Sequence, residues 1–176
     1  THNTFVGQGI ASGDWTTTAS TSNTGVGSGV MQGAMNGALG NTALGVDSLN
    51  ALTSGDYNTA LGFNAGASIN SGGYNVFVGY NAGDAVNTAA GNVFLGASAG
   101  SACTDTANAV LIGNGAGEDA DIASDGTIAI GYQSLKPLIN GARNVAIGYQ
   151  TLTAATTADD NTAVGEGSAK AITTGD

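Results

Sequence analysis

The chain has 176 residues, of which 30 are glycine and only 9% are charged, and its formal net charge is −10. A chain with few charged residues and 41% apolar residues is not expected to be disordered. A collagen helix is excluded as well, because it needs glycine at every third position and that pattern is absent. An acidic surface repels phosphate backbones and anionic lipids, so we expect no nucleic-acid partner. No run of 18 apolar residues occurs, so we expect no membrane insertion.

One short motif, Asn-(Thr/Val)-x-(Val/Leu/Ile)-Gly, recurs along the whole chain. The ten copies close at glycines separated by 20, 18, 17, 17, 17, 17, 18, 17 and 17 residues. Eight copies begin with asparagine, and degenerate copies begin at Ala109 and Thr127. A unit of this length cannot bury an apolar face alone, so the period predicts a stacked array.

The first two copies differ from the others. The longest interval contains Trp15, the only tryptophan. Terminal repeats of stacked arrays are atypical because they cover an open end. We therefore read 1–176 as a single β-solenoid domain with capping coils in 1–40 and regular coils in 41–176, cut from a longer fibre. We assign Trp15 to the cap. The alternative is that its ring is exposed and stacks on a glycan.

The residue before each closing glycine is aliphatic in every copy, which favours a short strand. We predict that these side chains form an inward core column, and that the Thr, Val or Ile two residues earlier shares their face. The predicted core column is Val6, Val26, Leu44, Leu61, Val78, Leu95, Ile112, Ile130, Ile147 and Val164.

A second apolar column follows seven residues after the glycine. Ala34 fits this column and Asp14 breaks it, and its other members are Leu52, Ile69, Val86, Cys103, Ala120, Leu138, Ala155 and Ile172. Two short strands per copy, separated by turns rich in Gly, Asn and Asp, predict an all-β parallel β-solenoid, or β-roll, of about ten 17-residue coils. Such a rod would be roughly 45–50 Å long.

Phe77 and Phe94 occupy the strand face opposite the predicted core column, in adjacent copies. On a lone solenoid they would be exposed, and an exposed patch of this kind is unfavourable. We therefore expect both rings to contact another subunit. A parallel homotrimer is the assembly we expect, because cyclic symmetry suits a fibre axis.

Four copies carry the motif most clearly, and they read NTALGFNAG from Asn58, NVFVGYNAG from Asn75, NVFLGASAG from Asn92 and NVAIGYQTL from Asn144. The pattern resembles the repeat of trimeric autotransporter adhesin heads, which are YadA-like left-handed parallel β-rolls, and that of bacteriophage tail fibres. The resemblance extends from Asn3 to about Ala169. It implies a left-handed homotrimer in an extracellular fibre.

The function expected from this resemblance is a structural and receptor-binding segment of a virion tail fibre that attaches to host-surface carbohydrate. A bacterial adhesin head, on the cell surface, is the close alternative. An ice-binding solenoid would need an outward row of threonines, whereas the threonines here are predicted inward: Thr4, Thr24, Thr42, Thr59 and Thr162. A polysaccharide depolymerase is the enzyme alternative, but equal coils leave no groove walls, so we expect no enzyme and no catalytic residues.

Asparagine opens most copies of the motif, and we expect the stacked amides to form a structural ladder rather than a ligand site. Its regular members are Asn41, Asn58, Asn75, Asn92, Asn144 and Asn161.

We expect no cofactor, since the only histidine is His2 and Cys103 fits an apolar column. Calcium is the one metal considered, because spaced carboxylates can hold it through oxygen ligands. The candidates are Glu118, Asp119, Asp121 and Asp125, for which a solvated turn is the commoner explanation.

Overall fold

The computed structural model describes residues 2–13, 18–119, 126–136, 141–157 and 159–174. Each copy of the motif contributes one three-residue strand. The strands are β1 (Thr4–Val6), β2 (Thr24–Val26), β3 (Thr42–Leu44), β4 (Thr59–Leu61), β5 (Val76–Val78), β6 (Val93–Leu95), β7 (Val110–Ile112), β8 (Ile128–Ile130), β9 (Val145–Ile147) and β10 (Thr162–Val164).

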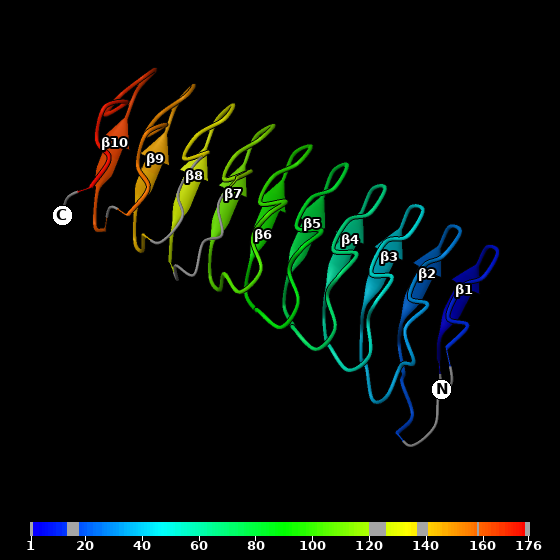
Figure 1. Cartoon of the computed structure of the whole chain (residues 1–176). Coiled ribbons are helices and arrows are strands. Elements are labelled where there is room, and N and C mark those ends of the chain that lie inside the picture. Colours follow the sequence, from blue (N-terminus) through cyan, green and yellow to red (C-terminus); the bar gives the residue numbers. More distant parts are fainter. Residues whose placement is uncertain (1, 14–17, 120–125, 137–140, 158, 175–176) are drawn as a thin grey trace.

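The ten strands form one sheet in the order β1 to β10, and every neighbouring pair is parallel. Equivalent motif positions pair directly, as where Val76 lies opposite Val93. The coils stack in a single row with the chain termini at opposite ends (Figure 1). The prediction of an all-β parallel β-solenoid is therefore confirmed.

Where the structure describes it, the second segment of a coil is a turn or bend rather than the predicted second strand. Leu52, Ile69, Val86, Cys103 and Ala155 of the second column are nevertheless fully buried. Ala34 is exposed, and the neighbouring Met35 is buried instead. Ile172 is half-buried, and Asp14, Ala120 and Leu138 lie outside the described residues.

The predicted core column is wrong, because the aliphatic residue before each closing glycine points away from the core. Val6 is 58% exposed and Val164 is 65% exposed, while the middle residue of each strand points inward. In a strand, side chains alternate between faces, so only one of these columns can lie inside. The residues that point outward are Val6, Val26, Leu44, Leu61, Val78, Leu95, Ile112, Ile130, Ile147 and Val164.

The prediction that Phe77 and Phe94 contact another subunit is also wrong. Both side chains are fully buried in the coil, with ring centroids 5.5 Å apart. The rings fit because the turn residues against them are glycines. A methyl group added at Gly66 would lie 2.6 Å from the Phe77 ring. One added at Gly100 would lie 2.5 Å from the Phe94 ring.

In most coils the middle strand residue and the turn residue six positions later complement each other in size. Phe77 and Phe94 are followed by Gly83 and Gly100, whereas alanine is followed by leucine in the pairs Ala43 and Leu49, Ala129 and Leu135, and Ala146 and Leu152. All of these apolar side chains are buried. Ala60 and Gly66 are both small, but there the Phe77 ring of the next coil lies against Gly66. The core is thus filled through side chains of the same and of neighbouring coils, as close packing requires.

Except for Gly165 in the last coil, each closing glycine lies against the backbone of the next coil. Gly96 has φ of +138°, and a methyl group added there would lie 2.5 Å from the carbonyl oxygen of Gly113. Only glycine fits this conformation and this approach. The invariance of the closing glycine within the repeat therefore follows from coil stacking.

The asparagine column forms a hydrogen-bonded ladder inside the coil. Asn58 donates its Nδ2 to Asn41 Oδ1 at 3.0 Å and to the Gly72 carbonyl at 2.8 Å. Its own Oδ1 accepts the Asn75 backbone N–H at 3.1 Å. Each amide thus joins its coil to both neighbours. Asn41, Asn58, Asn75, Asn92 and Asn144 are fully buried and Asn161 is half-buried.

Replacing Asn58 by alanine is expected to destabilise the fold by about 2–3 kcal/mol, because it leaves buried backbone groups of Gly72 and Asn75 without partners. Urea unfolding measures the loss, with Asn114→Ala, an exposed asparagine, as the control. Equal small effects of both substitutions would show that the ladder contributes little to stability.

Candidate functional site

The outward side of the ten-stranded sheet carries two rows of side chains, which we call the outer sheet face. One row is the aliphatic column described above. The second row is threonine in β1 to β4 and β10 and valine or isoleucine in β5 to β9, and it also points outward rather than inward as predicted. The middle coils therefore present β-branched and aliphatic side chains only.

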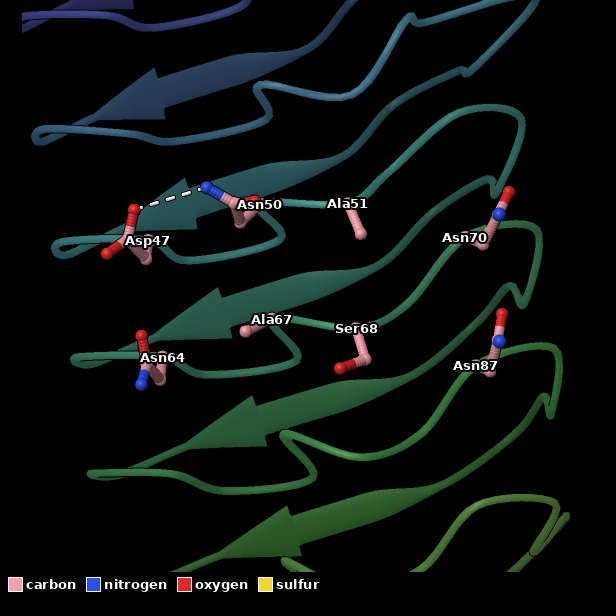
Figure 2. Close-up of a pocket in the computed structure, with 8 residues that line it drawn as sticks. All are labelled: Asp47, Asn50, Ala51, Asn64, Ala67, Ser68, Asn70 and Asn87. Carbon is pink, nitrogen blue, oxygen red and sulfur yellow. Dashed lines mark hydrogen bonds between the residues drawn. The ribbon is translucent and has the colours of Figure 1, made fainter.

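A hollow of about 560 Å³ lies on the turn segments of neighbouring coils, and we call it the first hollow. Polar side chains from the bends and the far loops surround a floor of small residues (Figure 2). Its lining residues are Asp47, Asn50, Ala51, Asn64, Ala67, Ser68, Asn70 and Asn87.

Part of the first hollow is held rigidly by internal hydrogen bonds. Asn50 donates its Nδ2 to the Gly29 carbonyl at 2.9 Å. It also donates to Asp47 Oδ1 at 3.1 Å (Figure 2). Within the described part of the chain, the side chains of Asn64, Ser68 and Asn87 make no hydrogen bond. These two amides and one hydroxyl can therefore donate to and accept from a ligand rich in hydroxyl groups.

Exposed aromatic rings belong to residues that adjoin the lining of this hollow in the sequence. Phe63 precedes the lining residue Asn64, and its ring stacks on that of Tyr80 with centroids 5.6 Å apart and planes inclined by 15°. The rings are 46% and 56% exposed. A rigid apolar surface beside hydrogen-bonding groups is the usual composition of a small-molecule site.

Two coils beyond Asp47 and Asn50, the equivalent positions are occupied by Asn81 and Asp84. The Oδ1 atoms of Asn81 and Asp84 are buried and have no hydrogen-bond partner among the described residues. Burial raises the pKa of the Asp84 carboxyl above 3.8, and a backbone hydrogen bond opposes this only in part.

Replacing Asp84 by asparagine is expected to stabilise the protein at neutral pH by about 1 kcal/mol, because the new amide can donate as Asn50 does. Because the native pKa of Asp84 is raised, its ionisation costs stability as pH rises through that pKa. The stability advantage of Asp84→Asn over the unmodified chain should therefore fade below pH 3.8, where the Asp84 carboxyl is protonated in both the folded and the unfolded state. Thermal unfolding at several pH values measures it. The control is Asp105→Asn at an exposed position. If this variant gains the same stability, the effect comes from the change in net charge alone.

The calcium candidates are only partly described. Glu118 and Asp119 face Lys136, whose Nζ lies 2.9 Å and 3.7 Å from their carboxylates. The pKa of Lys136 is raised, first by its hydrogen bond to Glu118. Asp121 and Asp125 lie outside the described residues, and in the described ranges no three His, Cys, Asp or Glu side chains are placed to hold a metal ion.

Three other positions were singled out in the sequence, and the structure describes two of them. Cys103 is buried and free of disulfides. His2 is exposed, and Trp15 lies outside the described residues. Where the chain is described, there is no helix of the length and apolarity that crossing a bilayer requires.

No family model matches the sequence, and neither a curated protein nor a solved structure matches it. Function must then be inferred from the surfaces of the chain itself, namely the outer sheet face and the first hollow.

Proposed function

We propose that the chain is a non-catalytic segment of an extracellular fibre that assembles as a parallel homotrimer and attaches to cell-surface carbohydrate. The observation that carries this proposal is the outer sheet face, where aliphatic side chains point outward along the whole rod. A left-handed coil belongs to the same proposal, as does a phage tail fibre as the parent structure. A bacterial adhesin head is the alternative parent.

Assembly is favoured by the extent and regularity of the outer sheet face. Monomeric proteins rarely expose apolar patches larger than a few hundred Å². One outward aliphatic side chain per strand runs along all ten parallel strands, and in β5 to β9 the second outward side chain is apolar as well. Three copies around one axis would bury these faces together while keeping the rods parallel.

Attachment to carbohydrate is favoured by the first hollow. Its free amides and hydroxyl match the hydroxyl groups of a sugar, and the Phe63–Tyr80 pair offers the flat apolar surface beside them. Single contacts of this kind are weak. Three copies on a stiff rod would bind a cell surface through avidity.

A glycan array with the intact chain tests the attachment. The double variant Asn64→Ala/Ser68→Ala should lose most binding to neutral glycans, whereas Asn114→Ala should retain it. Absence of binding to any neutral glycan by the unmodified chain, or equal binding by the double variant, would contradict a role for the first hollow.

Ice binding is a second candidate, favoured by one specific observation. The threonines Thr4, Thr24, Thr42 and Thr59 stand outward and exposed in consecutive coils, contrary to the expectation that had weighed against this function. Thermal hysteresis of a dilute solution tests the idea. Strong hysteresis, lost in Thr42→Lys/Thr59→Lys, would replace the fibre proposal for the outer sheet face.

A further inference from the structure

A second hollow, of about 240 Å³, lies on the same turn face near the C-terminal end of the rod. The chain has only three lysine and arginine residues, and two of them line this hollow. Its lining residues are Asp119, Gln133, Lys136, Gln150, Thr153 and Lys170. The molecule has a net charge of −10, so the second hollow is a site where cationic side chains are concentrated on an otherwise acidic chain.

The two lysines differ in how far their charges are balanced. Lys136 is paired with Glu118 and Asp119. Lys170 instead donates to the side-chain oxygen of Gln150 at 3.3 Å, and no described carboxylate forms an ion pair with it. The ammonium group of Lys170 is therefore the unbalanced positive charge of the second hollow.

Hydrogen bonds extend from Lys170 across neighbouring coils. Gln150 accepts from Lys170 and donates its Nε2 to Gln133 Oε1 at 3.1 Å. Both glutamine oxygens thus accept from a donor, and the amide N–H groups of Gln133 donate to no other described group. Together with the ammonium group and the Thr153 hydroxyl, they form a set of donors suited to an anion.

An aromatic pair adjoins the lining residues of this hollow in the sequence, as one does at the first hollow. Tyr132 and Tyr149 directly precede Gln133 and Gln150, and their rings stack with centroids 5.2 Å apart and planes inclined by 16°. They are 43% and 50% exposed. The same arrangement therefore occurs twice along the rod, once beside neutral amides and once beside cations.

We propose that the second hollow binds a sugar that carries a carboxylate, with the ring against Tyr132 and Tyr149 and the carboxylate against Lys170 and Gln133. The inference rests on the proposed attachment to carbohydrate and adds a chemical class of ligand. The first hollow, lined by Asp47 and uncharged groups, has no cation to attract such a sugar.

Oligogalacturonate and its methyl ester form a matched pair of probes, because they share the sugar ring and differ in the charge of the carboxyl group. Calorimetry with the intact chain should show about fivefold tighter binding of the acid form, a preference that falls with added salt. Lys170→Gln should abolish this preference. Arg143→Gln removes the same charge elsewhere and should preserve it.

Equal affinity for acid and ester in the unmodified chain would overturn the inference, as would equal loss of preference in Lys170→Gln and Arg143→Gln. Acetate at the same carboxylate concentration should not displace the oligomer, and full displacement would overturn a sugar site in favour of a general anion site. Failure with both galacturonate probes, alongside retained binding of neutral glycans, would remove this inference but leave the proposed function standing.

Discussion

Replacing Phe77 by alanine is expected to destabilise the protein by about 3–5 kcal/mol. The side chain is fully buried beside Phe94, and the glycines that admit it have no side chains with which to fill the cavity. Denaturant unfolding at fixed chain concentration measures the loss, because an assembling protein has a concentration-dependent stability.

Phe63→Ala is the matched control, since Phe63 is 46% exposed on the adjacent turn. We expect its effect to stay within about 1 kcal/mol. If both substitutions cost the same small amount, Phe77 does not occupy the core, and the inward assignment of the middle strand residues fails.

Replacing Leu95 by aspartate is expected to abolish assembly while leaving the solenoid folded. In the isolated chain Leu95 is 43% exposed, so a carboxylate there remains in water. In a trimer the same carboxylate would be buried without a partner in each subunit, at a cost of several kcal/mol. Size-exclusion chromatography with light scattering, together with circular dichroism, separates dissociation from unfolding.

The control for this variant is Ala102→Asp, which adds the same charge to an exposed position on the turn segments. It should assemble like the unmodified chain. An assembled Leu95→Asp variant, or a monomeric Ala102→Asp variant, would show that the outer sheet face is not the contact surface.

The repeat itself was readable from the sequence, because each part of the motif has one structural cause. The closing glycine, as at Gly96, touches the backbone of the next coil, and the asparagine, as at Asn58, bonds to both neighbouring coils. Both requirements recur once per coil. The period therefore predicted a parallel solenoid without knowledge of any side-chain direction.

The direction of the strand faces was not predicted correctly, because both faces are apolar. Invariant aliphatic residues such as Leu95 were assigned inward on hydrophobicity alone. A usable signal lay in the size complementarity between the middle strand residue and the turn residue six positions later. Phe94 is followed by Gly100, whereas Ala146 is followed by Leu152. Only side chains that share a core must conserve volume in this way.

The two hollows could not be predicted from the repeat, since they depend on how unlike residues from several coils lie side by side. Asn64 and Asn87 are separated by more than one period, and so are Gln133 and Lys170. Their columns vary from coil to coil, as variable surface positions do. The stacked aromatic pairs were visible as recurring residues after the glycine, but their place beside the hollows was not.

Sedimentation equilibrium of the unmodified chain tests the central claim most directly, namely that the outer sheet face packs against further copies of itself. We expect a single species of three times the chain mass of 16.9 kDa across a wide range of concentrations. A stable species of 16.9 kDa at high concentration would contradict the account, because the aliphatic rows would then face water.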